Sequence, residues 1–237
     1  MTRTHPHELL QRARAVIFDF DGTIKDSVAA KGDAFVELFS TAPVAVQHKI
    51  HDHHVAHGGV SRFKKLPLYA AWADVPRDEA SLARLADSLS KIMIKRVVSS
   101  PWISGHSAIW RLHEVVPFVG LASATPLGEL STIVSELGLQ DWFDDVWGHP
   151  TTKQMAIIDA TTRLDIPPSD VLLVGDSADD ATAASESGAM FVGIGHRVSS
   201  QCSEPDLTWL VGYLPSNNEG GGAPRHDGGR REYPPDR

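Results

Sequence analysis

The sequence predicts an α/β fold: a doubly wound, Rossmann-like parallel sheet into which an α-helical cap domain is inserted. Three observations predict it. Short apolar runs alternate with helical patterns in the second half of the chain, as in strand–helix–strand units. Residues 27–98, which lack a convincing strand and read as largely helical, separate the first apolar run from the others. Acidic or hydroxyl residues follow several of the runs, where open parallel sheets bind their ligands.

The elements follow from the local pattern in chain order. Residues 1–13 are polar and form an N-terminal arm or a fraying helix. We expect strands at residues 14–19, 115–121, 143–147, 171–174 and 190–194. We expect helices at residues 27–40, 78–98, 127–137, 151–164 and 178–187, and irregular backbone at residues 41–65. The core domain is therefore 14–26 and 99–213, the helical insertion is 27–98, and the Gly- and Pro-rich tail 214–237 is expected to be disordered.

Composition limits the partners and the compartment. The chain has 237 residues and a formal charge of −8, which argues against nucleic-acid binding because that draws on a basic surface. Cys202 is the single cysteine, so no disulfide forms within the chain and a reducing compartment is expected. The sequence has no apolar stretch like a signal peptide and none of membrane-spanning length. We therefore expect a cytoplasmic protein with no membrane partner.

Two carboxylates, Asp19 and Asp21, follow the apolar run 15–18. Strand side chains alternate, so the two would point the same way if the strand continued. Like charges this close repel unless a cation lies between them or one holds a proton. Mg²⁺ prefers carboxylate and phosphate oxygens, so the pair indicates chemistry on a phosphate. The alternative interpretation is a helix cap, with Asp21 or Thr23 accepting backbone N–H bonds.

A second acidic motif follows the apolar run 171–174. Asp176 ends this expected strand, and Asp180 lies one helical turn later on the same side. A helix cap with surface acids is the alternative. It does not explain why a buried strand delivers an acid, since an unpaired buried charge is costly. Metal coordination therefore explains this motif better.

A hydroxyl and a cation complete the set of candidates. Ser123 follows an apolar run and precedes Thr125-Pro126, where a helix can begin. By itself Ser123 indicates a plain helix cap, although a hydroxyl and free N–H groups at a helix start also bind anions. Lys153 lies early in an expected helix, where a solitary lysine is usually solvent-exposed. Its position would also let it neutralise a bound phosphate and a nucleophile.

In this order and on these elements, the four motifs resemble those of the haloacid dehalogenase (HAD) superfamily of phosphotransferases. The resemblance rests on Asp-x-Asp-Gly-Thr at 19–23, Ser123, Lys153 and Gly-Asp-x-x-x-Asp at 175–180. The insertion resembles a C1-type cap, as in the phosphoglycolate phosphatase and β-phosphoglucomutase-like branch. Lys25 departs from the apolar residue usual in that branch.

The resemblance implies a role for each motif. Asp19 would attack phosphorus to give an aspartyl-phosphate, and Asp21 would protonate the leaving oxygen and then activate water. The implied cofactor is Mg²⁺, held by Asp19, by the backbone carbonyl of Asp21 and by Asp176, with Asp180 steadying Lys153 or a metal-bound water. The implied phosphate-binding residues are Thr23, Ser123, Ala124 and Lys153.

Four histidines and Asp52 lie in residues 51–65 and raise the alternative of a zinc site. Their spacing matches no common zinc motif, so we favour a solvated or substrate-facing loop. In the branch that the chain resembles, the cap supplies specificity. The candidate substrate-binding residues are His57, Ser61, Arg62 and Lys65.

The expected function is a Mg²⁺-dependent phosphomonoester hydrolase acting on a small metabolite, with a sugar or cyclitol phosphate favoured. The expected partner is that phosphate ester, and the expected state is a monomer or homodimer. One alternative is a phosphomutase of the β-phosphoglucomutase type, which shares the same motifs. A phosphate-receiving signalling module is less consistent with the helical insertion and with Asp21 as a built-in acid and base. A glycosyltransferase would leave the motifs at 123, 153 and 176 unexplained.

Overall fold

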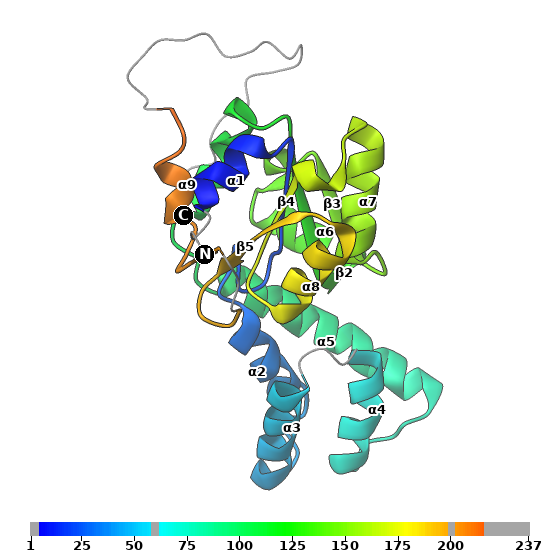
Figure 1. Cartoon of the computed structure of the whole chain (residues 1–237). Coiled ribbons are helices and arrows are strands. Elements are labelled where there is room, and N and C mark those ends of the chain that lie inside the picture. The colour runs from blue at the N-terminus through cyan, green and yellow to red at the C-terminus, as the bar shows by residue number, and fades with distance from the viewer. Residues whose placement is uncertain (1–4, 58–61, 199–201, 216–237) are drawn as a thin grey trace. The chain divides into compact units, whose positions relative to one another are not determined.

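The computed structural model describes residues 5–57, 62–198 and 202–215. The chain divides into two compact units (Figure 1). The sheet unit comprises residues 1–26 and 102–237, and the helical unit comprises residues 27–101. Among the described residues, none of the helices is both long and apolar enough to cross a membrane.

The sheet unit is built on six parallel strands in the order β3-β2-β1-β4-β5-β6. Their bounds are β1 Ala15–Phe18, β2 Phe118–Pro126, β3 Asp145–His149, β4 Val171–Gly175, β5 Met190–Ile194 and β6 Ser203–Glu204. The first strand, β1, lies in the middle of the sheet. Strands β2 and β3 follow on one side of it, and β4, β5 and β6 follow on the other side. This is the doubly wound order, so the predicted fold class is confirmed.

The central strand is apolar because helices cover both faces of the sheet. All four residues of β1 are buried, and Ile17 pairs in register with Gly120 of β2 and Leu173 of β4. A parallel strand buried on both faces shows a continuous apolar run rather than an alternating one. The sequence run 15–18 has this pattern.

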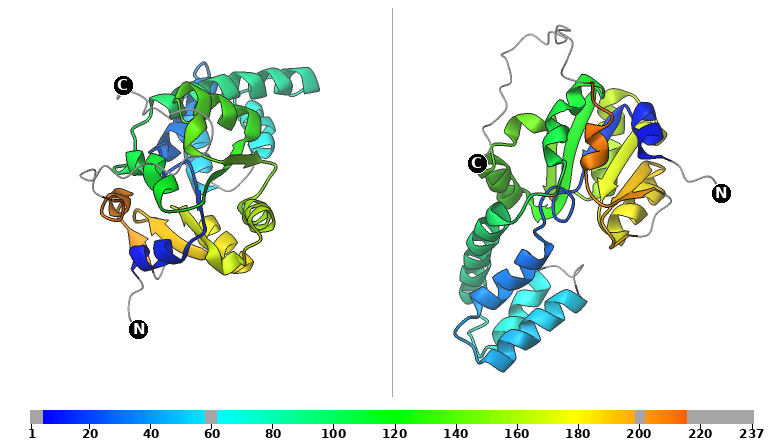
Figure 2. Two further views of the ribbon diagram at one scale, coloured as in Figure 1. Left: turned by 90° about the horizontal axis from the view of Figure 1, so that it is seen from above. Right: turned by 90° about the vertical axis from the view of Figure 1, so that its left-hand side faces the viewer.

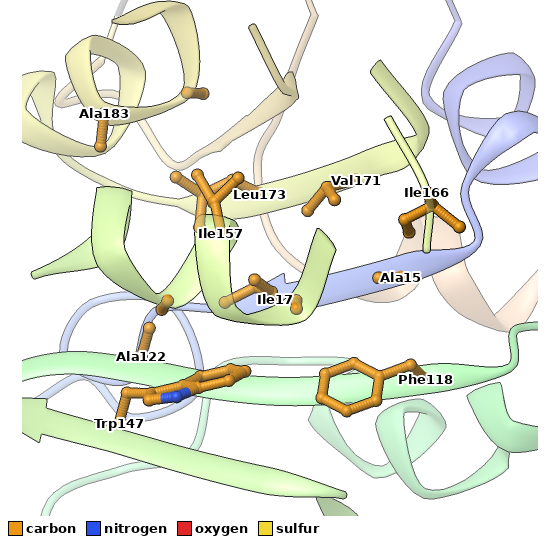
Figure 3. Packing of buried hydrophobic residues seen from close by; sticks show 13 residues of the cluster. Ala15, Ile17, Phe118, Ala122, Trp147, Ile157, Ile166, Val171, Leu173 and Ala183 are labelled. Carbon is orange, nitrogen blue, oxygen red and sulfur yellow. The ribbon is translucent and has the colours of Figure 1, made fainter. Parts of the chain in front are cut away.

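Helices α6 Leu127–Glu136, α7 Lys153–Leu164 and α8 Ala178–Ser187 each follow a strand of the sheet. On one face, Ile157 of α7 packs against Ile17 and Leu173, as Figure 3 shows. Short 3₁₀ helices lie at His106–Glu114, Gln140–Trp142 and Pro168–Asp170. The helix α1 Pro6–Arg12 lies beside α9 Thr208–Val211 (Figure 2), where His7 donates from Nε2 to the carbonyl of Trp209.

The helical unit contains α2 Val28–Leu38, α3 Val44–Ala56, α4 Arg62–Trp72 and α5 Glu79–Ser99. The side chain of Asp78 caps the N-terminus of helix α5 by accepting a hydrogen bond from the backbone N–H of Ser81. Its buried stripe includes Leu89, Met93 and Val97, in agreement with the apolar spacing in the sequence. The stripe packs on residues of α2 and α4.

The prediction of irregular backbone at residues 41–65 is wrong, because α3 and the start of α4 lie there. Helix α3 has no regular apolar stripe, and Ile50 is its one buried residue. Aromatic contacts of its histidines replace the stripe. His54 lies 4.9 Å from the ring of Phe35, and His53 lies 5.5 Å from the ring of Tyr69. Hydrophobic periodicity counts apolar side chains and not histidines. It therefore does not predict a helix that packs through histidine rings.

Two strand predictions also need correction. The strand expected at 115–121 starts later and extends to Pro126, so that Ser123 lies within β2 and not after it. The strand expected at 143–147 is shifted to Asp145–His149. The pairing of β2 with β3 changes register between Ala122 and Pro126, and such an irregularity re-aims the side chains within it.

Acid should destabilise the helical unit through His54. Burial, and then the charge of Lys65, lowers the pKa of His54 to about 4. The unfolded chain binds a proton at this residue below about pH 6.5, and the folded chain does not until about pH 4. The contribution of His54 to the free energy of unfolding is therefore fully present above about pH 6.5 and is lost as the pH falls to about 4. Urea unfolding measures this effect. Between pH 7 and pH 5 the free energy of unfolding should decrease less in His54→Gln than in the parent.

Val55→Ala is the control on the same helix, because Val55 is exposed and does not titrate. It should show the same pH dependence as the parent. An unchanged pH dependence in His54→Gln would remove His54 as the cause.

Candidate active site

The acidic motifs meet where the strand order reverses. Asp19 follows β1, Asp176 follows β4, and these strands are neighbours in the sheet. The backbone N–H of Asp19 donates to the carbonyl of Val174 at 2.8 Å, which continues the pairing one residue beyond β1. Open α/β sheets bind ligands at this switch point, beyond the carboxyl ends of the strands.

Lys153 joins two of the carboxylates. Its Nζ lies 2.8 Å from Oδ1 of Asp19 and also forms an ion pair with Oδ1 of Asp180. Lys153 is the first residue of α7, and the Thr152 side chain caps that helix. The lysine is largely buried, so it is not the solvent-exposed residue that a solitary helical lysine suggests. The predicted cation thus contacts the predicted nucleophile.

Asp180 is fixed from its other side by a capping box at the start of α8. Its Oδ2 accepts hydrogen bonds from the hydroxyl of Ser177 at 2.6 Å and from the backbone N–H of Ser177 at 3.0 Å. The Ser177 hydroxyl in turn accepts from the backbone N–H of Asp180. Asp180 therefore has little freedom to move, which suits a group that positions Lys153.

Burial and charge crowding perturb the pKa values in the cluster. Burial raises the pKa of Asp19 to about 7, although the charge of Lys153 opposes the shift. Burial, and then the charge of Asp180, raises the pKa of Asp176 to about 6. Burial lowers the pKa of Lys153, but Asp19 and Asp180 more than compensate, so the net shift is upward. A cation bound among these carboxylates would favour their ionised forms.

Oxygens of Asp19, Asp176 and Asp180 lie within 4.8 Å of one another, and all three residues are buried. Carboxylate oxygens are the ligands that Mg²⁺ prefers, so the donor set fits this cation. Gly22 makes the approach possible. It has a φ of +88°, and a Cβ at this position would lie 2.1 Å from Oδ2 of Asp176. The glycine of the first motif thus makes room for the acid of the last.

The carboxylate of Asp21 is not one of the three that form this cluster of ligand atoms. Its Oδ2 accepts hydrogen bonds from Ser123 Oγ at 3.4 Å and from Thr125 Oγ1 at 3.2 Å. Both hydroxyls lie in the irregular part of β2. Because β1 ends at Phe18, strand alternation does not orient Asp19 and Asp21, and the two acids have different partners.

Sequence reasoning missed three residues that touch the site. Thr125 lies two positions beyond Ser123, and this spacing is the one sequence feature that could have indicated that both hydroxyls reach the site. Ser177 could have been found from the Ser-x-x-Asp spacing of a capping box. Arg197, in the loop after β5, places Nη1 3.4 Å from Oδ2 of Asp176, and no local pattern marked it.

The remaining predicted phosphate-binding residues are Thr23 and Ala124. Thr23 is buried, and its Oγ1 has no hydrogen-bond partner among the described residues. Ala124 is exposed, in the irregular part of β2. The hydroxyl and the exposed backbone are compatible with phosphate binding, which stays a prediction for both residues.

Three of the four candidates in the helical unit lie in the described part of the chain. Lys65 is buried and donates to Nδ1 of His54 at 3.2 Å. His57 is exposed and stacks on His53, with ring centroids 4.1 Å apart. Arg62 is partly buried at the start of α4, and Ser61 lies outside the described residues. Substrate binding by these four residues stays a prediction.

Buried carboxylates and a lysine at the switch point of a doubly wound sheet are typical of the active site of an α/β enzyme. A family model described as haloacid dehalogenase-like hydrolase matches residues 16–194. The chain belongs to this family, as its motifs predicted, and it is an enzyme of the hydrolase class.

Curated relatives and solved structures agree with this assignment. The chain is 26% identical over 225 residues to a phosphoglycolate phosphatase of Neisseria meningitidis, covering 87% of this chain and 92% of the relative. A structure titled as a predicted phosphoglycolate phosphatase of Haemophilus somnus superposes with a TM-score of 0.66 at 14% identity, covering 85% of this chain and 97% of the other. A Thermotoga maritima structure provisionally titled β-phosphoglucomutase gives a TM-score of 0.65 at 19% identity, covering 85% and 100%. At these identities the two structures establish the fold alone.

Removing Lys153 should destabilise the sheet unit. Lys153→Met leaves Asp19 and Asp180 buried without their shared cation, and breaking such a pair costs about 3 kcal/mol in the free energy of unfolding. Urea denaturation in a metal-free buffer at pH 7.5 would measure the loss. The loss should be smaller at pH 5, because burial raises the pKa of Asp19 to about 7 and a protonated Asp19 no longer needs the cation.

Lys153→Arg is the matched control, because it keeps the positive charge. It should retain most of the stability. A Lys153→Met protein as stable as the parent at pH 7.5 would contradict the bridging role.

Proposed function

We propose that this enzyme is a Mg²⁺-dependent phosphomonoester hydrolase that acts on a small metabolite through an aspartyl-phosphate. The hydrolase family and the relatives named phosphatases make it a phosphatase. One observation carries the finer proposal. Asp19 lies among buried carboxylates and contacts Lys153, whereas the Asp21 carboxylate is held separately by two hydroxyls.

Asp19 is the proposed nucleophile. When bound by Asp19, Asp176 and the backbone carbonyl of Asp21, Mg²⁺ would reduce the repulsion between the attacking carboxylate and the phosphate. Lys153 holds Oδ1 of Asp19 and limits its rotation, so that the other oxygen is free to attack phosphorus. The bond from Asp19 to phosphorus forms as the ester oxygen leaves, and Lys153 also provides a cation for the phosphoryl oxygens.

Asp21 is the proposed proton carrier. It would protonate the departing alkoxide in the first step and take a proton from the attacking water in the second. The hydroxyls of Ser123 and Thr125 donate to Oδ2 of Asp21 and so orient the carboxylate for proton transfer. A built-in acid and base of this kind favours rapid hydrolysis over a stored phosphoryl group.

We further propose a small phosphate ester as the substrate, with a sugar or cyclitol phosphate favoured, and a monomer or homodimer as the working state. The two Neisseria relatives are named for phosphoglycolate, which therefore belongs among the compounds to test. A cytoplasmic location is proposed from the single cysteine, Cys202. The second candidate function is a phosphomutase, the activity for which the Thermotoga structure of the same fold is provisionally named.

A panel of phosphate esters with Mg²⁺ tests the proposal. Release of inorganic phosphate from at least one small ester, lost on addition of a chelator, is the expected result. Isomerised sugar phosphate without free phosphate would instead establish the mutase. Two results would contradict the proposal. One is that no ester in the panel releases phosphate with Mg²⁺, and the other is that the enzyme stays fully active in the presence of the chelator.

A further inference from the structure

Arg197 approaches the acidic cluster from a part of the chain that the four motifs do not include. It lies in the loop after β5, and its Nη1 is 3.4 Å from Oδ2 of Asp176. The side chain of Arg197 is 53% exposed, whereas that of Asp176 is 7% exposed. A half-exposed surface cation thus pairs with a buried metal-ligand candidate.

The charges at the site explain why this pair matters. Asp19, Asp176 and Asp180 place oxygens within 4.8 Å of one another, and Lys153 and Arg197 each pair with members of this group. Removing the positive charge of Arg197 would leave the group more negative, and its attraction for a divalent cation would be stronger.

The two cations differ in how firmly they are held. Lys153 lies between Asp19 and Asp180 and is 15% exposed, so moving it would leave two buried carboxylates without their cation. Arg197 contacts Asp176 at the long end of the hydrogen-bond range and reaches solvent. A half-exposed ion pair of this length contributes little to stability, so separating it costs little.

We propose that Arg197 is a displaceable counter-ion of Asp176, which competes with the catalytic cation for this carboxylate and thereby sets the metal affinity of the site. The inference rests on the proposed magnesium-dependent function. Arg197 acts through Asp176 and takes no part in bond making. It is a positioning residue whose effect is a weaker, more readily reversible metal site.

The opposite role makes the opposite prediction. If Arg197 instead oriented Asp176 for the metal, its removal would weaken metal binding, because hydrogen-bond partners of ligating carboxylates usually strengthen affinity. The direction of the change in the Mg²⁺ dissociation constant therefore decides between competition and orientation.

Isothermal titration of the full chain with Mg²⁺ alone tests the inference without relying on activity. Arg197→Gln should tighten the dissociation constant about fivefold, which corresponds to about 1 kcal/mol of removed repulsion. Arg197→Lys keeps the charge and should stay within about twofold of the parent. Arg163→Gln is the matched control, since Arg163 is 52% exposed and pairs with Asp145 and Asp159 away from the carboxylate cluster. Its dissociation constant should not change.

Unchanged or weaker Mg²⁺ binding by Arg197→Gln would overturn the inference and leave the proposed function standing. Equal tightening in Arg163→Gln would also overturn it, because the effect would then come from net charge alone. A parent protein that bound no Mg²⁺ would overturn the proposed function, and the inference with it.

Discussion

Asp19→Asn should lower the rate of phosphate release by at least about 10³-fold, because an amide cannot form the acyl phosphate. The fold should survive the change. The substituted amide has nearly the size of the carboxylate, and the charge of Lys153 would still be balanced by Asp180. Steady-state turnover of the best ester in the panel, together with the urea midpoint, measures both effects.

Asp179→Asn is the matched control for charge removal. Asp179 is exposed, lies next to Asp180 in α8, and is absent from the carboxylate cluster. This variant should retain the parent rate. If Asp19→Asn released phosphate as fast as the parent, Asp19 would not be the nucleophile.

Asp21→Asn should lower turnover by about 10² to 10⁴-fold, the usual contribution of a general acid or base. The amide can keep its contacts with Ser123 and Thr125, so the loss should come from proton transfer and not from disorder. Aryl phosphates need less help with their leaving group than alkyl phosphates. For aryl esters the variant should therefore still form the aspartyl-phosphate and then stall at its hydrolysis.

Acid quenching after mixing with a labelled aryl phosphate would detect the stalled phosphoenzyme. Asp26→Asn is the matched control, because Asp26 is exposed and lies in the same loop. It should neither slow turnover nor accumulate phosphoenzyme. Unaltered turnover by Asp21→Asn would remove Asp21 from the mechanism.

The fold was predictable where periodicity reports burial. The run 15–18 and the stripe of α5 both reflect apolar side chains that reach a core, and both elements are confirmed. Helix α3 was not predictable in this way, because the rings of His53 and His54 take the place of an apolar stripe. The extension of β2 through Ser123 escapes prediction for a related reason. The pairing of β2 with β3 decides where that strand ends, and local sequence does not report pairing.

The sequence by itself determined the candidate site residues, because Asp19, Asp176 and Lys153 each lie at the end of a strand or the start of a helix, and those positions are local properties. Only the tertiary structure decided which residues meet. Lys153 reaches Asp19, and Arg197 reaches Asp176, through a strand order that no local pattern encodes. The same pairing of strands brings Ser123 to Asp21, whereas Asp19 pairs with Lys153. Contacts between distant parts of a chain depend on how its elements pack, and that packing is settled by the whole core at once.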